Sequence, residues 1–396
     1  MQKALSWILA LVGLTGFVRA EWIELPWPEL GASLPIWKPD NFDPSKRYPA
    51  IVYYHGTGGT ATASYIHRAT EGKGFILVGM TYRHKSGFEY SDGEIADSLG
   101  LLNALKKTLV KSLAVDPQRI YVGGFSKGGW HTAMLLDRDR SLAGGMILGA
   151  GVFEKRAKSR AFSKQLPVFI GCGRYDGNYP QALGALVHFR KLGAEITLDA
   201  WPRIGHQFPE APPEAMRQWL RIRAGGAGLE AEAGKWISKR LLELHAISDP
   251  VESWFALEEF VSLPFVKLFG VTAEKSAREK ITDLLTNPVV ATEKKWRGES
   301  RKILARESRD RLLGTLKAAS TAHAVLAQKA AGTRAGADAV RDFERTQKLL
   351  KTAKVVTRPG KPAAHPITPE LRPSAPSTNP DRSPFLPPGI KVKPAK

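Results

Sequence analysis

Hydrophobic runs and amphipathic segments alternate along the first 222 residues of the chain. The run at 48–54 is continuously apolar, which is typical of a strand buried on both faces. The segment 94–113 instead carries apolar side chains at helical spacing, at Ile95, Leu99, Leu102, Leu105 and Leu109. Strands that alternate with helices predict an α/β fold, with a doubly wound and mostly parallel sheet covered by helices on both faces.

The same patterns place the individual elements of a domain over 21–222. Strands are expected at 34–37, 48–54, 75–82, 120–122, 143–150, 167–172 and 195–201, and helices at 94–113, 130–136, 180–192 and 212–222. The strand at 34–37 is predicted to lie at an edge of the sheet. The segment 21–30 is rich in proline and tryptophan and is predicted to be irregular.

The composition changes after residue 222. A glycine-rich segment at 223–228 is expected to be a linker, and 229–356 lacks strand alternation. An all-helical module of three to five helices is predicted there, with one helix beginning at Asp249-Pro250 and one long helix over 289–331. The many charges of this region are interpreted as solvated helix faces.

The two ends of the chain differ in composition from a folded domain. Lys3 precedes an apolar run over 4–18 and a small-residue cleavage site at 18–20, so 1–20 is predicted to be a signal peptide of an exported protein, periplasmic or secreted. The run is short for a membrane span, and an uncleaved anchor stays open as an alternative; no transmembrane span is predicted elsewhere. Residues 357–396, rich in proline, are predicted to form a disordered basic tail.

The net charge of +20 over 396 residues is strongly basic. Through the tail, this charge favours anionic cell-envelope polymers as partners, whereas nucleic acid is not expected because no binding motif is recognised. The single cysteine, Cys172, leaves no intrachain disulfide and is interpreted as a small buried hydrophobe. The sequence has no metal-ligand spacing and no phosphate-binding glycine loop, so neither a metal nor a cofactor is predicted.

A candidate nucleophile follows the strand at 120–122, in Gly124-Phe125-Ser126-Lys127-Gly128. Glycines on both sides of the serine suit a sharp strand-to-helix turn that exposes its hydroxyl. The helix expected after the turn would direct backbone N–H groups and its positive dipole end at Ser126. This arrangement predicts a nucleophilic serine beside donors for an oxyanion.

A second set of oxyanion donors is expected from the loop after the strand at 48–54. The segment His55-Gly56-Thr57-Gly58-Gly59 leaves backbone N–H groups exposed at the end of that strand. Gly56 and Thr57, together with the backbone N–H of Lys127, are therefore the predicted oxyanion or substrate-binding residues. The side chain of Lys127 could face the pocket rim and favour anionic substrates, but a solvated lysine is the favoured interpretation.

A nucleophilic serine requires a base and an acid, and candidates for both follow Ser126 in the sequence. His206 follows the last strand and is the predicted general base, and Asp176, which follows the strand at 167–172, is the predicted acid that orients it. Asp199 lies within a strand and is interpreted as structural. His131, one helical turn beyond Ser126, is interpreted as a packed or solvated side chain.

Over about residues 34–222, these motifs resemble the α/β-hydrolase family, in particular its secreted esterases, polyhydroxybutyrate depolymerases and feruloyl esterases. The resemblance rests on the 55–59 loop, the serine motif at 124–128, Asp176 and Gly205-His206. It implies an eight-stranded type of sheet and a serine nucleophile whose partners follow in the order Ser, Asp, His.

The function expected from these residues is an exported serine hydrolase that cleaves carboxylic esters through an acyl-enzyme intermediate. Between Ser126 and Asp176 the only inserted sequence is a short basic segment at 153–165, which favours an open site for bulky, polymeric or polysaccharide-linked esters. A serine peptidase on the same fold stays open as an alternative. A non-catalytic envelope protein that binds through the helical module and basic tail is a second alternative.

Overall fold

The computed structural model describes residues 21–40, 42–83, 91–152, 161–162, 165–308 and 313–352. The predicted signal peptide and basic tail lie outside these residues, as does most of the basic segment at 153–165. Within the described ranges, none of the helices combines the length and apolar character that crossing a membrane requires.

An eight-stranded sheet forms the centre of the molecule, in the order β1-β2-β4-β3-β5-β6-β7-β8. β2 pairs antiparallel with β1 and β4, and every other pair is parallel. This confirms the predicted mostly parallel α/β fold. The strands are β1 Glu21–Trp27, β2 Ala32–Lys38, β3 Tyr48–Tyr54, β4 Ile76–Met80, β5 Val115–Phe125, β6 Gly144–Leu148, β7 Pro167–Gly173 and β8 Glu195–Trp201.

Two predictions at the N-terminal edge were wrong. The segment expected to be irregular contains β1, which makes β1 the edge strand and places β2 one position inside it. Prolines obscured this strand in the sequence, although an edge strand tolerates residues that lack an N–H. Cross-strand packing stabilises the hairpin: Trp22 lies opposite Trp37, with ring centroids 5.5 Å apart.

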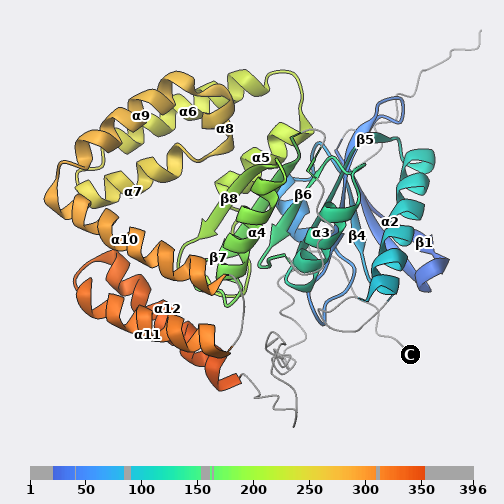
Figure 1. Ribbon diagram of the computed structural model, residues 1–396. Helices are drawn as coiled ribbons and strands as arrows, with labels where there is room; N and C mark the ends of the chain where they lie inside the picture. Colours follow the sequence, from blue (N-terminus) through green and yellow to red (C-terminus); the bar gives the residue numbers. More distant parts are fainter. Residues whose placement is uncertain are drawn as a thin grey trace, which may run out of the picture.

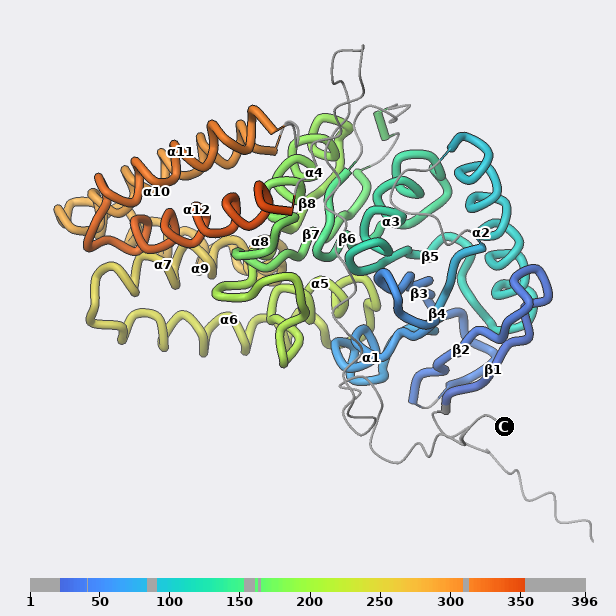
Figure 2. The backbone as a smooth tube through the Cα atoms, turned by 90° about the horizontal axis from the view of Figure 1, so that it is seen from below, coloured from blue at the N-terminus to red at the C-terminus, as the bar shows by residue number. Residues whose placement is uncertain are grey.

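Helices cover both faces of the sheet (Figures 1 and 2). One face carries α2 Asp92–Ser112, α3 Lys127–Arg138 and α4 Tyr179–Lys191, and the other carries α1 Ser64–Thr70 and α5 Glu214–Ala224. Alternate residues of the central strands supply the two cores: Val168 and Ile170 of β7 point to the first and Phe169 to the second. This layering places the carboxyl ends of the parallel strands at one common edge.

The region after α5 is entirely helical in its described residues, with seven helices instead of the expected three to five. They are α6 Leu229–His245, α7 Pro250–Phe260, α8 Pro264–Phe269, α9 Val271–Leu284, α10 Pro288–Glu307, α11 Leu313–Lys329 and α12 Arg334–Thr352. The predicted start of α7 is confirmed, because the Asp249 side chain accepts a hydrogen bond from the Glu252 N–H at 2.7 Å.

The single long helix predicted over 289–331 was wrong. This stretch is divided between α10 and α11, which pack side by side with α12 (Figure 1). Folding back buries charged side chains that a straight helix would leave in water, including Glu307 at the end of α10, which is 1% exposed. Helical periodicity continues across such a reversal, so the sequence pattern alone did not mark it.

The helical region shares its core with the sheet. Trp219 of α5 and Phe265 of α8 belong to the same buried cluster as Phe169 of β7, and the Gln218 side chain accepts a hydrogen bond from the Phe265 N–H at 3.0 Å. On the opposite face, Leu304 of α10 joins the cluster that includes α4. The segments before and after 223–228 thus pack into the same hydrophobic clusters. That 223–228 is a linker between two domains stays a prediction.

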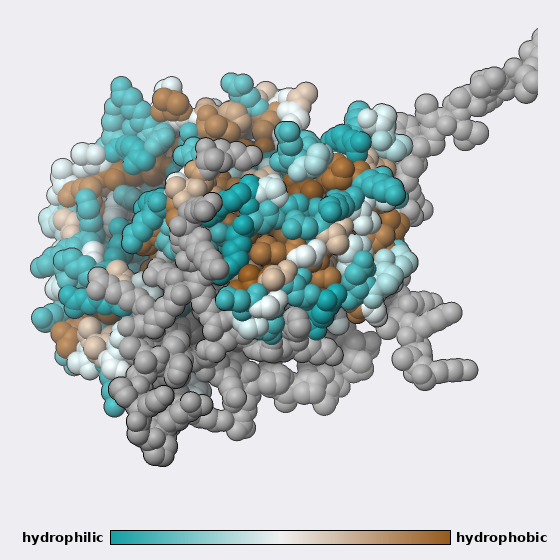
Figure 3. Space-filling view, turned by 45° about the vertical axis from the view of Figure 1, so that its right-hand side comes forward, coloured by the Kyte–Doolittle hydropathy of each residue, from teal (hydrophilic) through white to brown (hydrophobic). Residues whose placement is uncertain are grey.

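The face of the molecule in Figure 3 alternates hydrophilic side chains with separate apolar patches. Several exposed charged side chains of the helical region form ion pairs within one helix, such as Arg278–Glu274 and Lys302–Glu299. These pairs agree with the interpretation of the charges as solvated helix faces, but they do not account for the buried charges of α10 and α12 described below.

Leu257→Ala tests the shared core. Leu257 of α7 is fully buried in the cluster that joins the helices to the sheet, so we expect the free energy of unfolding to fall by about 2–5 kcal/mol. Leu242→Ala, at a side chain of α6 that is 73% exposed, is the matched control and should change it by less than about 0.5 kcal/mol. Urea unfolding followed by circular dichroism measures both, and equal effects would contradict the shared core.

Candidate active site

Ser126 lies at a strained elbow between β5 and α3. Its backbone has φ 55° and ψ −118°, a region that residues with a β-carbon rarely adopt. The flanking glycines make the turn possible: a β-carbon on Gly124 would lie 2.4 Å from the Gly128 carbonyl carbon, and one on Gly128 would lie 2.0 Å from the Tyr54 carbonyl oxygen. The sequence motif therefore forms the sharp turn that was predicted.

The structure brings Ser126, His206 and Asp176 into one hydrogen-bonded chain. His206 Nε2 lies 2.8 Å from Ser126 Oγ, and its Nδ1 lies 2.7 Å from Asp176 Oδ2. A carboxylate only accepts hydrogen bonds, so Nδ1 carries the imidazole proton and donates a hydrogen bond to Asp176. Nε2 is then the acceptor, and the serine hydroxyl donates to it, which is the arrangement needed to remove the serine proton.

Asp176 is held from both sides of its carboxylate. It follows β7 and is 1% exposed. Its Oδ1 accepts a hydrogen bond from the Asn178 N–H at 2.8 Å, while Oδ2 faces His206. The Asn178 side chain in turn donates to the Gly149 carbonyl at 2.8 Å. Sequence reasoning assigned no role to Asn178, although its position two residues after an aspartate suits such a local turn.

The predicted oxyanion residues lie beside the serine. The 56–57 loop follows β3, which pairs parallel with β5, and a β-carbon on Gly56 would lie 3.5 Å from Ser126 Cβ. Thr57 is exposed. Lys127 occupies the first position of α3, where backbone N–H groups point along the helix axis toward its N-terminus. Two backbone segments therefore meet next to Ser126.

The expectation that Lys127 is solvated was wrong. The residue is 6% exposed, and its Nζ lies 4.6 Å from the centre of the Tyr82 ring. Burial lowers the pKa of Lys127, and the charge of Glu94 partly opposes this effect. The tight elbow causes this burial, because α3 begins directly against the end of β3 and places its first side chains inside the fold.

His131 is a packed side chain, in agreement with one of its two interpretations. Its ring lies 4.6 Å from that of Tyr54 and 5.1 Å from that of Tyr82, and the residue is 2% exposed. Burial, with a smaller contribution from the charge of Lys127, lowers the pKa of His131 to about 3. The imidazole that contacts Ser126 is that of His206.

Three aromatic side chains pack in a row beside His206, and the sequence analysis did not predict them. The Phe125 ring lies 5.0 Å from the imidazole and 4.4 Å from Phe208, which stacks on Tyr65 at 3.7 Å. Phe125 and Phe208 flank two predicted site residues in the sequence, so their positions beside Ser126 and His206 were the available signal. The side chain of His206 nevertheless keeps 28% of its surface exposed.

Asp199 is a half-buried residue of β8. Its Oδ2 accepts a hydrogen bond from Trp201 Nε1 at 3.1 Å. Burial raises the pKa of Asp199 to about 7; the hydrogen bond from Trp201 opposes this shift and the charge of Glu259 adds to it. The contact of His206 with Asp176 agrees with the choice of Asp176 over Asp199 as the candidate acid.

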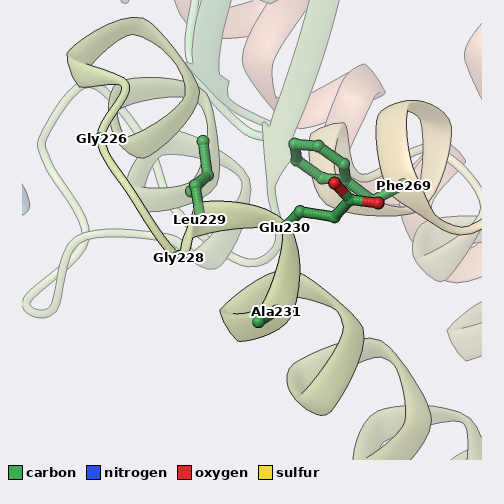
Figure 4. Close-up of a pocket in the computed structure, with 6 residues that line it drawn as sticks. All are labelled: Gly226, Gly228, Leu229, Glu230, Ala231 and Phe269. Carbon is green, nitrogen blue, oxygen red and sulfur yellow. The ribbon is translucent and has the colours of Figure 1, made fainter.

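Other features of the described residues lie away from this chemistry. Cys172 is a buried free cysteine of β7, as expected. No cluster of three or more His, Cys, Asp or Glu side chains in the described ranges could hold a metal ion. A surface pocket of about 720 Å³ lies at the start of α6, where the Glu230 side chain extends beside the Phe269 ring (Figure 4). It contains none of the predicted site residues.

The sheet and this site together define the α/β-hydrolase fold: a serine at a strand-to-helix elbow, and an aspartate and a histidine from the loops after two later strands. The predicted fold is thus confirmed, while the secreted esterase and depolymerase branch stays a prediction.

Comparisons with known proteins give partial matches, and no protein-family model matches the chain. It is 25% identical to a probable carboxylesterase SOBER1-like of Arabidopsis thaliana over 142 residues, 33% of this chain and 54% of that protein. It is 28% identical to a probable dipeptidyl-aminopeptidase B of Ajellomyces capsulatus (strain H88) over 127 residues, 28% of this chain and 13% of that protein. A solved carboxylesterase structure from Mesorhizobium loti is similar with a TM-score of 0.41 and 15% identity, covering 51% of this chain and 98% of that one.

Gly128→Ala tests the elbow. Because the new methyl group would lie 2.0 Å from the Tyr54 carbonyl oxygen, we expect a loss of about 3 kcal/mol or more in the free energy of unfolding. Gly298→Ala in α10 is the matched control: its methyl group meets nothing within 4 Å, and alanine should raise helix stability by up to about 1 kcal/mol. Thermal unfolding distinguishes them, and a harmless Gly128→Ala would refute the close packing.

Asp199→Asn tests whether the Asp199 carboxyl group keeps its proton in the folded protein. Burial raises the pKa of Asp199 to about 7 in the folded protein, against about 3.9 in an unfolded chain. The folded protein therefore keeps a proton that the unfolded chain releases, and its stability falls as the pH rises from about 4 to about 7. In urea unfolding, we expect the variant to differ least from the parent protein at pH 4 and to be more stable at pH 8. An equal difference at both pH values would contradict this.

Proposed function

We propose that the chain is a serine hydrolase that cleaves carboxylic esters through an acyl-enzyme intermediate. The observation that carries the proposal is the continuous hydrogen-bonded chain from Ser126 through His206 to Asp176, with contacts of 2.8 and 2.7 Å. Its nucleophile sits at a strained elbow directly beside two backbone segments that could stabilise an oxyanion. A merely structural serine would not need this combination.

The proposed reaction begins when Ser126 Oγ attacks the ester carbonyl carbon and its proton passes to His206 Nε2. The carbonyl oxygen gains the negative charge and accepts hydrogen bonds from the backbone of Lys127 and of the 56–57 loop. Collapse of this intermediate breaks the bond to the alcohol, which takes the proton from His206. Water then attacks the acyl group with His206 again as base, releasing the acid and restoring Ser126.

Asp176 has two tasks in this scheme. Its carboxylate keeps the proton of His206 on Nδ1, and it stabilises the imidazolium that forms when Nε2 is protonated. Because Asp176 is 1% exposed and also accepts the Asn178 N–H, the carboxylate is fixed before substrate binds. Such preorganisation avoids the reorganisation that water would require.

The substrate class is inferred from the similar proteins and from the exposure of the site. Similarity to a probable carboxylesterase supports an ester, and similarity to a probable dipeptidyl-aminopeptidase makes peptide cleavage on the same fold the second candidate. The exposed 57–60 loop and the partly exposed His206 support an accessible site, and hence bulky, polymeric or polysaccharide-linked esters. Export through the segment 1–20, and binding of anionic envelope polymers by the basic tail, belong to the same proposal.

These observations favour the alternative of a non-catalytic binding protein least. A scaffold would have no need for a hydroxyl, an imidazole and a carboxylate aligned within hydrogen-bonding distance.

Ser126→Ala tests the reaction. Removing the nucleophile should lower kcat for p-nitrophenyl acetate by about 10⁴-fold or more, while Ser45→Ala, at an exposed serine, should leave it unchanged. Steady-state hydrolysis by the full chain measures both. Hydrolysis that survives Ser126→Ala would disprove the mechanism. Absence of ester hydrolysis, together with serine-dependent cleavage of aminoacyl p-nitroanilides, would establish the peptidase alternative.

A further inference from the structure

The loop that carries Asp176 contacts helix α12, more than 160 residues later in the chain. This loop, residues 174–178, joins β7 to α4. Two residues before Asp176, the Arg174 guanidinium donates to both carboxylate oxygens of Asp342, at 2.9 and 2.7 Å. The Arg174 side chain is 14% exposed and that of Asp342 is 1% exposed, so the pair is largely shielded from water.

Two further contacts join the loop to α12 on either side of Asp176. The Tyr175 hydroxyl donates to Asp338 Oδ1 at 3.3 Å. Beyond the aspartate, a β-carbon placed on Gly177 would lie 3.7 Å from Leu349 Cδ2, so the loop backbone runs close to the helix there as well. The neighbours of Asp176 on both sides therefore face α12.

Asp342 is itself fixed by other buried charges. Arg345 Nε donates to Asp342 Oδ1 at 3.4 Å, and the Arg345 guanidinium forms a bidentate pair with Glu307 of α10. His323 of α11 lies between the two carboxylates, 3.4 Å from Glu307 Oε2 and 4.0 Å from Asp342 Oδ2. Asp342 thus connects the loop to all three C-terminal helices.

The other side of the loop is joined to the segment that leads to His206. The Arg174 N–H donates to the Trp201 carbonyl at 2.8 Å, and the Tyr175 N–H donates to the Ile204 carbonyl at 2.9 Å. His206 lies two residues beyond Ile204. Arg174 therefore joins two parts of the structure. Its backbone N–H contacts the segment that leads to His206, and its side chain contacts α12.

The charges of this cluster are maintained by their partners. Burial alone would lower the pKa of Arg174, but the hydrogen bonds and charge of Asp342 outweigh burial and raise it. Burial would raise the pKa of Glu307, but hydrogen bonds and charge from Arg345, with a smaller contribution from His323, lower it to about 2. Both side chains therefore stay ionised near neutral pH.

Ion pairs of this kind define geometry more than they add stability. An apolar pair of similar volume often stabilises a fold as well as a buried ion pair does, whereas a bidentate arginine–carboxylate contact fixes both distance and direction. Held in this way, Arg174 leaves the loop little freedom. Reactive groups out of place by about 1 Å can lower a rate by about 10²-fold, so such a restraint matters next to Asp176 and His206.

We propose that α12 positions Asp176 for catalysis, with the Arg174–Asp342 ion pair as the tether that holds the acid loop against His206. Arg174 and Asp342 are then positioning residues that act through Asp176, and α12 affects catalysis through this one contact. This inference rests on the proposed function of the Ser126, His206 and Asp176 chain.

The test compares Asp342→Asn with Glu293→Gln. Each change replaces a buried carboxylate by its amide, but Glu293 of α10 accepts the Arg334 and Ala335 N–H groups at the start of α12 and does not contact the acid loop. With p-nitrophenyl acetate we expect Asp342→Asn to lower kcat about tenfold or more with little change in KM. Glu293→Gln should leave both unchanged, and Asp342→Glu, which keeps the charge, should recover part of the lost kcat.

Hydrogen–deuterium exchange measures the restraint without relying on turnover. The Arg174, Tyr175 and Asp176 amides are hydrogen-bonded in the folded protein. In Asp342→Asn, we expect the segment 174–178 to exchange about tenfold faster or more, with no such increase in Glu293→Gln.

The double variant Arg174→Met with Asp342→Leu covers the case in which Asp342→Asn does not fold, because it leaves no unpaired charge at this contact. It should fold, lose kcat to a similar extent and show the same faster exchange. Unchanged exchange at 174–178 in a folded variant that lacks the ion pair would overturn the tether. So would an equal loss of kcat in Asp342→Asn and Glu293→Gln. The parent protein could also hydrolyse neither esters nor peptides while the variants still exchange faster. That result would refute the proposed function and leave the tether in place.

Discussion

The close approach of α3 to the end of β3 is the constraint on which the rest of the site depends. At the elbow, Gly128 lies so near the Tyr54 carbonyl that no β-carbon fits between them. This contact brings the N-terminus of the helix, the Ser126 hydroxyl and the 56–57 loop to one point. It also accounts for the burial of Lys127 and His131, which face inward because the helix begins inside the fold.

The parallel sheet determines how the other two groups reach that point. Asp176 and His206 follow β7 and β8, which are neighbours in the sheet, and Ser126 follows β5. Carboxyl ends of parallel strands lie at one edge, so side chains far apart in the chain converge without long connecting loops. The imidazole remains partly exposed between a buried carboxylate and a buried serine, so it is accessible from solvent.

Charge is used in two different ways in the helical region. Pairs such as Lys302–Glu299 lie on exposed helix faces, where they are screened and contribute little to stability. The pairs that involve Arg174, Asp342, Arg345 and Glu307 are buried, and each carboxylate among them has a directed partner. These buried charges connect the three C-terminal helices to the loop that carries Asp176. The helices and the sheet therefore meet through specific contacts as well as through apolar packing.

The sequence by itself determined the features that depend on local chain geometry. Periodicity located most strands and helices, Asp249 marked the start of α7, and the glycines around Ser126 defined the elbow, because each follows from residues a few positions apart. Chain order, together with position directly after a strand, selected Asp176 and His206 as candidates. Only the tertiary structure decided the pairing of β1 with β2, the reversal within 289–331 and the burial of Lys127. The same holds for the contact of Arg174 with Asp342, which joins residues 168 positions apart. Such contacts are set by which surfaces meet in space, and no local pattern in a single sequence records that.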